Sequence, residues 1–99
     1  MRVRDCIAAG HPSLVGHFPG NPVVPGVLLL ARVARAAAPL MKGPLAAIPA
    51  AKFHAPLRPA EHFEIELEAE GKASIGFRVR RGELLVASGM LRFGARDTA

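Results

Sequence analysis

The sequence contains no tryptophan, no tyrosine and only one cysteine, Cys6. With a single cysteine the chain cannot form an internal disulfide, which is typical of proteins that act in the reducing cytoplasm. The absence of Trp and Tyr removes most of the side chains that stack on nucleic-acid bases. Because the sequence also carries no nucleic-acid motif, we expect no nucleic-acid partner.

Acidic residues are absent from the whole stretch between Cys6 and Ala60, and the formal net charge of the chain is +5. Such a basic balance favours an acidic partner. The stretch from Cys6 to Ala31 has no charged Asp, Glu, Lys or Arg, but its histidines and prolines exclude a membrane span. The apolar run that follows Asp5 is too short for a secretory signal. We therefore expect a cytoplasmic protein.

A chain of 99 residues predicts one small domain that spans residues 1–99. Such a domain buries about two-thirds of the surface of its unfolded chain. With 51% hydrophobic and 21% charged residues, the composition is typical of a globular protein. Residues 94–99 are expected to form a frayed tail.

The hydrophobic pattern predicts an α+β fold in which one early strand and one helix precede a run of antiparallel strands. Pro39 marks the expected end of the helix. Val3 and Ile7 are expected to face inward from the first strand. The expected elements are strand 2–9, helix 26–38, strand 48–57, strand 62–70, strand 73–80 and a last strand with the inward row Leu85, Ala87, Gly89, Leu91 and Phe93.

Strand 62–70 has the clearest alternation in the sequence. Its apolar residues are expected on one face and its glutamates on the other, opposite the arginines of the following strand. Four carboxylates in a row could hold a metal, but their regular spacing away from any loop favours a solvated face. The inward residues are Phe63, Ile65, Leu67 and Ala69, and the outward ones are Glu64, Glu66, Glu68 and Glu70.

The helix predicted over 26–38 is apolar on nearly every side, which indicates a buried helix. Its many alanines would allow a sheet to wrap closely around it. Arg32 and Arg35 share one polar edge of this helix. That edge is either solvated or a contact for an acidic protein.

The stretch from Gly16 to Leu28 combines a histidine with three prolines and precedes the helix. Proline fixes φ, so the loop is expected to be stiff. Pro25 stands where a helix begins, because its missing N–H costs nothing there. His17 is thus held just upstream of a helix N-terminus, where free N–H groups can bind a carbonyl oxygen or an anion.

The residues His17-Phe18-Pro19-Gly20-Asn21-Pro22-Val23-Val24-Pro25-Gly26-Val27 resemble the signature of the 3-hydroxyacyl-acyl-carrier-protein dehydratases of the FabZ/FabA type. The stretch Lys52–Pro59 is similar to a second motif of that family, a strand followed by a bend. The resemblance implies a hotdog fold, in which an antiparallel sheet of about five strands wraps around one central helix. It also implies dimers that join their sheets edge to edge.

The resemblance implies that His17 is the catalytic base, which suits the near-neutral pKa of an ordinary imidazole. N–H groups around Gly26 and Val27 would bind the thioester oxygen. The family carries a catalytic Glu or Asp fourteen residues after the histidine, and Ala31 stands at that position here. No metal or cofactor is implied. The implied substrate-binding residues are Phe18, Pro19, Gly20, Pro25, Gly26 and Val27, and the implied carrier-protein contacts are Arg32 and Arg35.

Three hypotheses follow from the missing carboxylate. The chain can be a dehydratase-like subunit of fatty-acid or polyene synthesis that receives the acid from a Glu- or Asp-bearing hotdog partner in a heterodimer. It can act as a homodimer on acyl thioesters, as a weak dehydratase or as a thioesterase. It can also be a non-catalytic binding or stabilising subunit. The substrate would be attached to acyl carrier protein or to coenzyme A. Asp5 and Glu61 are the only acids that could return to the site through the fold.

Overall fold

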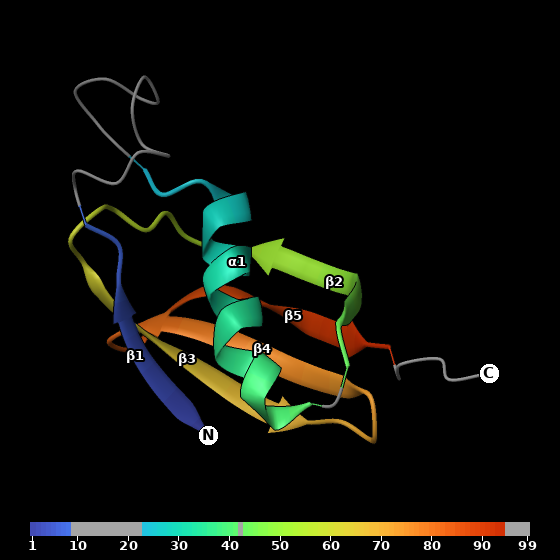
Figure 1. Cartoon of the computed structure of the whole chain (residues 1–99). Coiled ribbons are helices and arrows are strands. Elements are labelled where there is room, and N and C mark those ends of the chain that lie inside the picture. The colour runs from blue at the N-terminus through green and yellow to red at the C-terminus, as the bar shows by residue number, and fades with distance from the viewer. Residues whose placement is uncertain (9–22, 42, 95–99) are drawn as a thin grey trace.

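A computed structural model describes residues 1–8, 23–41 and 43–94 of the chain (Figure 1). Within these ranges the chain forms five strands, one α-helix and one short 3-10 helix, so the predicted α+β class is confirmed. The elements are β1 (Arg2–Cys6), α1 (Gly26–Ala37), η2 (Ala38–Leu40), β2 (Leu45–Phe53), β3 (His62–Ala69), β4 (Ser74–Arg81) and β5 (Leu84–Phe93).

The strands form one antiparallel sheet with the order β1-β3-β4-β5-β2. Helix α1 lies across one face of this sheet, and the other face is left without a covering element of the described chain (Figure 1). β1 and β2 are the two edge strands, so each has one row of backbone groups that no described strand pairs.

The hydrophobic core lies between α1 and the sheet. Strands β3, β4 and β5 supply most of it through their alternate residues, as the period-two pattern predicts. Ile7 is buried and Val3 packs against the core, which agrees with the inward positions predicted for them. Ala69 is exposed at the end of β3, where the predicted inward row stops.

The prediction that α1 is buried on nearly all sides is wrong for the single chain. Only the stripe Leu29, Val33 and Ala37 is buried. On another side of the helix Val27 is 81% exposed, and Ala31 and Arg35, which follow it at intervals of four, are exposed as well. The sheet lies against one side of the helix only, so the apolar residues Val27 and Ala31 remain exposed in the single chain.

The inward row predicted for the last strand is wrong at Leu85, because β5 contains a β-bulge. Val79 pairs with Ala87 but Arg80 pairs with Leu85, so Val86 is an extra residue on β5. Val86 is 1% exposed, whereas Leu85 is only half-buried. Strict alternation therefore places the wrong residue in the core at this point, because a bulge shifts the face of every residue beyond it.

The strand β2 begins three residues earlier than the predicted strand 48–57 and ends before the predicted bend. It contains Pro49, which an edge strand tolerates because one side of its backbone has no partner. Gly89 of β5 lies opposite Ala51, and a Cβ at Gly89 would stand 2.1 Å from the carbonyl oxygen of Ala50. Glycine is therefore needed there for β2 to approach β5.

In the hairpin of β3 and β4 the glutamates face the arginines, as predicted. Glu64 pairs with Arg80 and Glu66 pairs with Arg78, so the glutamate row faces the arginines on the open face of the sheet. In the described part of the chain no group of three or more acidic, histidine or cysteine side chains is arranged to hold a metal ion. The same residues contain no helix that is long and apolar enough to cross a membrane.

Candidate active site

The N-terminus of α1 is the described end of the candidate site. Pro25 is the N-cap residue, with extended backbone angles and no side chain that caps the helix. Its carbonyl oxygen accepts hydrogen bonds from the N–H groups of Leu28 and Leu29 at 3.1 and 3.2 Å. Among the described residues, the N–H groups of Gly26 and Val27 have no backbone acceptor. They are the donors that an oxyanion at this helix end would use.

His17, Phe18, Pro19 and Gly20 lie outside the described residues. Two backbone hydrogen bonds hold the described residues on either side of that segment. The N–H of Ala60 donates to the carbonyl oxygen of Ile7 at 2.7 Å, and the N–H of Val24 donates to that of Leu57 at 2.7 Å. Both ends of the predicted histidine loop are therefore anchored on the stretch between β2 and β3.

An apolar cavity of about 620 Å³ opens beside the start of α1. Its lining comes from the helix N-terminus, from the end of β2 and from the bend that follows β2. Of its lining residues in the described chain, His54 is the one with an ionisable side chain. The cavity is lined by Val23, Val24, Pro25, Gly26, Val27, Leu29, Leu30, Phe53, His54, Ala55, Pro56, Leu57 and Val86.

Phe53 packs against the helix start across this cavity. A Cβ at Gly26 would stand 2.7 Å from the Cζ atom of the Phe53 ring, so the ring approaches the bare backbone of the helix. Any larger residue at position 26 would therefore clash with the Phe53 ring. The sequence motif Lys52–Pro59 marked this strand and bend, but the cavity-lining role of Phe53 and His54 becomes visible only in the fold.

Ala31 lies on the exposed stripe of α1, one turn after Val27, which lines the cavity. At this position the helix presents a methyl group to the surface. The two acids that could return to the site through the fold lie elsewhere. Neither Asp5 nor Glu61 lines the apolar cavity.

Asp5 is engaged by the helix and by its own backbone. Its Oδ1 atom accepts hydrogen bonds from the Nη1 atom of Arg32 and from the N–H of Cys6, each at 2.7 Å. Arg32 is correspondingly half-buried and bound within the chain, whereas Arg35, its predicted companion as a carrier contact, is exposed. The ion pair joins β1 to α1, and it uses the charge of Arg32 internally.

Glu61 is held as a carboxylate. The backbone N–H of Arg58 and the side chain of Arg81 donate to it. These hydrogen bonds, the one from Arg58 first, lower the pKa of Glu61 below the ordinary value of a glutamate. A carboxyl group that stays ionised at neutral pH is a poor proton donor, so Glu61 does not suit the role of general acid.

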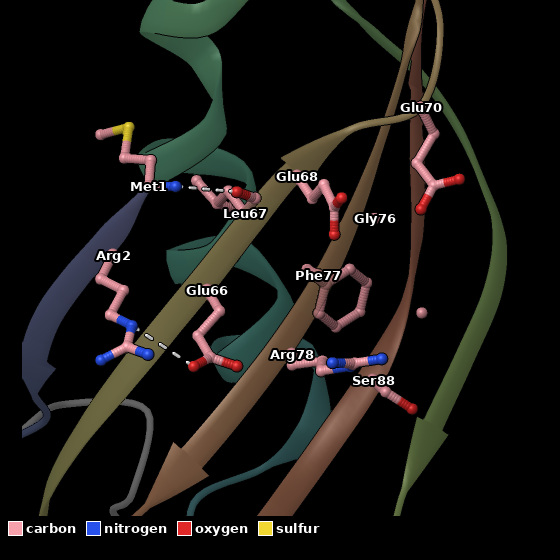
Figure 2. Close-up of a pocket in the computed structure, with 11 residues that line it drawn as sticks. Met1, Arg2, Glu66, Leu67, Glu68, Glu70, Gly76, Phe77, Arg78 and Ser88 are labelled. Atoms are coloured by element: carbon pink, nitrogen blue, oxygen red, sulfur yellow. Dashed lines mark hydrogen bonds and ion pairs between the residues drawn. The ribbon is translucent and has the colours of Figure 1, made fainter.

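The open face of the sheet carries a second, polar cavity of about 440 Å³ (Figure 2). Gly76 belongs to its lining, and a Cβ at this position would stand 2.9 Å from the Oε1 atom of Glu70. Glutamates of β3 border it on one side and Arg78 and Ser88 on the other (Figure 2). It is lined by Met1, Arg2, Glu66, Leu67, Glu68, Glu70, Gly76, Phe77, Arg78, Ser88 and Gly89.

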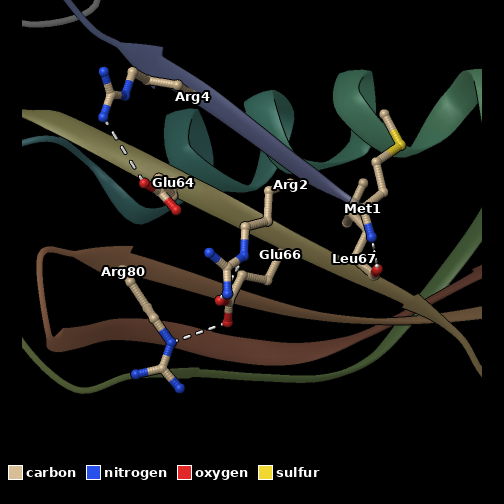
Figure 3. A network of polar contacts seen from close by, with 7 residues as sticks. All are labelled: Met1, Arg2, Arg4, Glu64, Glu66, Leu67 and Arg80. Atoms are coloured by element: carbon tan, nitrogen blue, oxygen red, sulfur yellow. Dashed lines mark hydrogen bonds and ion pairs between the residues drawn. The ribbon is translucent and has the colours of Figure 1, made fainter.

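Ion pairs cross this face from β1 to β4 (Figure 3). Glu66 accepts from Nε of Arg80 at 2.9 Å and lies 3.5 Å from Nε of Arg2. The Arg80 hydrogen bond, more than the charges around it, lowers the pKa of Glu66. Glu64 and Glu66 thus pair with arginines, and Glu68 and Glu70 are exposed, so the expected solvated face is confirmed.

Replacing Glu66 with glutamine should lower the free energy of unfolding at pH 7 by up to about 1 kcal/mol, as for other partly exposed ion pairs. Since the folded-state pKa is lowered, this stabilisation is present above the ordinary value of 4.5 and is lost as the pH falls through the folded-state pKa. Urea unfolding between pH 7 and pH 3 measures it. Glu68→Gln on the same strand is the control, and an equal loss in both variants would contradict the assignment.

Three comparisons place the chain among known proteins. Residues 1–90 match the ApeI-like family, described as ApeI dehydratase. The 3-hydroxyacyl-[acyl-carrier-protein] dehydratase FabZ of Thermomicrobium roseum is 31% identical over 92% of this chain and 70% of its own length. FabZ of Caulobacter sp. strain K31 is 33% identical over 76% of this chain, which spans about half, 53%, of that protein.

Among solved structures, the dehydratase heterocomplex ApeI:P of Xenorhabdus doucetiae superposes with a TM-score of 0.76 at 24% identity. The match covers 92% of this chain and 83% of that one. At this identity the likeness establishes the fold, and it agrees with the antiparallel sheet and single helix described above. The expected hotdog fold is therefore confirmed.

Proposed function

The chain belongs to the ApeI-like dehydratase family, and from this premise we propose that it is a dehydratase subunit that acts on 3-hydroxyacyl thioesters together with a second hotdog subunit. His17 is its base, and the acid comes from the partner. The observation that carries the proposal is the exposed stripe of α1, where Ala31 stands beside an apolar cavity that no described carboxylate lines.

The proposed reaction removes water across the α and β carbons of the acyl chain. His17 takes the proton from the α carbon, and the N–H groups of Gly26 and Val27 at the start of α1 stabilise the negative charge that develops on the thioester oxygen. The bond from the β carbon to its hydroxyl group then breaks while the α–β double bond forms. The departing hydroxyl needs a proton to leave as water, and Ala31 cannot supply one.

A partner subunit would supply that proton by covering the exposed stripe of α1. Val27 and Ala31 form an exposed apolar surface next to the cavity, and β2 is an edge strand whose outer side pairs with no described strand. A structural neighbour of this chain is a heterocomplex of dehydratase subunits, which supports an assembly of two different chains. A Glu or Asp on the partner's helix could then face His17.

The apolar cavity suits the acyl chain of such a substrate. Its volume of about 620 Å³ lies within the range of small-molecule sites, and its lining is almost entirely hydrocarbon. Phe53 stands at the helix start, where the thioester oxygen would bind, so the acyl chain would run along the ring into the cavity. The apolar lining favours a hydrocarbon chain over a polar one.

Replacing Ala31 with glutamate tests the missing acid directly. In a preparation that sedimentation shows to be a dimer of this chain, Ala31→Glu should raise the dehydration rate of 3-hydroxyacyl carrier protein at least about tenfold, since a positioned general acid contributes more than that in known enzymes. Ala31→Gln has the same shape without a proton to give and should show no gain. Equal rates for the two variants would contradict the proposal.

A further inference from the structure

The backbone is strained at Ala60, in the turn that leads from the bend after β2 into β3. Its φ angle is 69°, and among residues 1–8, 23–41 and 43–94 it is the one residue other than glycine with a positive φ. The N–H of Glu61 donates to the carbonyl oxygen of Arg58 at 3.3 Å, which closes a four-residue turn. Since Pro59 fixes a negative φ at the second position, this is a type II turn, whose third position favours glycine. Alanine keeps such a conformation only where its surroundings enforce it.

The carboxylate of Glu61 supplies that constraint with both of its oxygen atoms. Oε1 accepts a hydrogen bond from the backbone N–H of Arg58 at 2.7 Å, which joins the last residue of the turn to its first. Oε2 accepts one from the Nη1 atom of Arg81 at 2.5 Å, which joins the turn to the end of β4. Hydrogen bonds to an ionised carboxylate are stronger than those between neutral groups. Glu61 thus closes the turn 58–61 and fixes it to the sheet.

This region also binds the chain on either side of the segment that contains His17. The N–H of Ala60 donates to the carbonyl oxygen of Ile7 at 2.7 Å, before that segment. The carbonyl oxygen of Leu57, directly before the turn, accepts from the N–H of Val24 at 2.7 Å, after that segment. Ile7, Val24 and Leu57 are each at most 6% exposed, so both bonds belong to the core. One turn therefore sets the separation of two chain positions that flank the proposed base.

The second of these bonds also places the start of α1. Val24 is followed directly by Pro25, the N-cap residue, and then by Gly26 and Val27, whose N–H groups are the proposed donors to the thioester oxygen. Leu57 and Val24 both line the apolar cavity. A shift of the turn would therefore displace the proposed donors relative to the base. A displacement of about 1 Å in a catalytic arrangement can lower a rate by about 100-fold.

We propose that Glu61 is a positioning residue of the dehydration, which holds the turn 58–61 so that the flanks of the His17 segment and the start of α1 keep their relative places. This inference rests on the proposed function and adds a residue to it. Glu61 does not line the apolar cavity, so it acts through the turn and not on the substrate. Because the residues that line the cavity are unchanged when Glu61 is replaced, the effect belongs to kcat more than to KM.

Kinetics of the assembly that the native chain forms, with 3-hydroxyacyl carrier protein as substrate, test this role. Glu61→Ala should lower kcat at least about tenfold and change KM less than about threefold. Adding Ala60→Gly to that variant should restore at least about half of the native kcat, because glycine adopts a positive φ without help from a carboxylate. Circular dichroism checks that each variant is folded.

The matched control is Glu66→Ala. The Glu66 side chain is 24% exposed against 27% for Glu61, and it also bonds to an arginine of β4. Its ion pair contributes to stability away from the turn, so its loss should change kcat less than about twofold.

Amide hydrogen exchange gives a second readout that needs no activity. In Glu61→Ala the N–H of Val24 should exchange at least about tenfold faster, since local opening of the turn releases its acceptor, and Ala60→Gly should reverse this change. Glu66→Ala should leave the exchange rate of Val24 unaltered.

Three kinetic results would overturn the positioning role: an unchanged kcat in Glu61→Ala, a loss that Ala60→Gly does not restore, and an equal loss in Glu66→Ala. Faster exchange at Val24 with an unchanged kcat also overturns it, because Glu61 then has only a structural role. If the native assembly never dehydrates its substrate while exchange at Val24 rises as expected, the proposed function is wrong and the link from Glu61 to the start of α1 stands.

Discussion

Replacing His17 with alanine should lower the dehydration rate of the native assembly by about 10² to 10⁴-fold, which is the usual contribution of a general base. Among the described residues that line the cavity, only His54 has an ionisable side chain, and its Nε2 atom lies 2.9 Å from the Oγ atom of Ser88. The rate is measured at saturating 3-hydroxyacyl carrier protein. The loss should appear in kcat, since the substrate would still bind.

The matched control is His62→Ala. His62 is an exposed residue at the start of β3 and does not line the apolar cavity, so its loss should leave the rate within about twofold of the native value. A rate that survives in His17→Ala, or that falls equally in His62→Ala, would show that the signature histidine is not the base.

Replacing Phe63 with alanine should destabilise the chain by about 3 to 5 kcal/mol. Phe63 is among the largest fully buried side chains, and it lies on β3 where β1 pairs with it. Domains of this size are stable by only about 5 to 15 kcal/mol, so the variant should be close to unfolding at 25 °C. Urea unfolding at one fixed protein concentration measures the loss, because assembly makes stability depend on concentration.

Phe53→Ala removes the same side chain from an exposed place and serves as the control. The Phe53 ring is 51% exposed, so its loss should cost less than half as much stability as the loss of Phe63. If both variants unfold at the same urea concentration, the core does not lie between α1 and β3 as described.

Local patterns in the sequence were sufficient for most of the fold. The alternation from Phe63 to Leu67 predicts which face of β3 is buried, and the glutamates between them predict the arginine partners on β4. Pro39 correctly marks the end of α1, although η2 continues for one short turn. These features depend on near neighbours along the chain, where periodicity and proline chemistry are decisive.

Features that depend on distant segments could not be predicted in the same way. The bond between Asp5 and Arg32 joins residues 27 positions apart, and the bond between His54 and Ser88 joins residues 34 apart. The bulge at Val86 follows from strand pairing, and composition gives no sign of it. Each of these features depends on how segments that are distant in the sequence lie next to one another in the fold.

The helix α1 is the most informative difference between expectation and structure. Its sequence is apolar nearly all round, yet a single sheet covers only one stripe of it. The apolar composition of the exposed stripe makes physical sense when a second subunit covers it, and Ala31 lies within that stripe. The proposed partner subunit would account for both the missing carboxylate and the uncovered surface.

Native mass spectrometry of the protein purified from its own cells, followed by a dehydration assay of the same sample, tests this account most directly. We predict a complex with a different hotdog chain that bears a Glu or Asp on its central helix, and dehydration of 3-hydroxyacyl carrier protein that depends on both chains. A particle made only of this chain that hydrolyses acyl thioesters, or that leaves them unchanged, would contradict it.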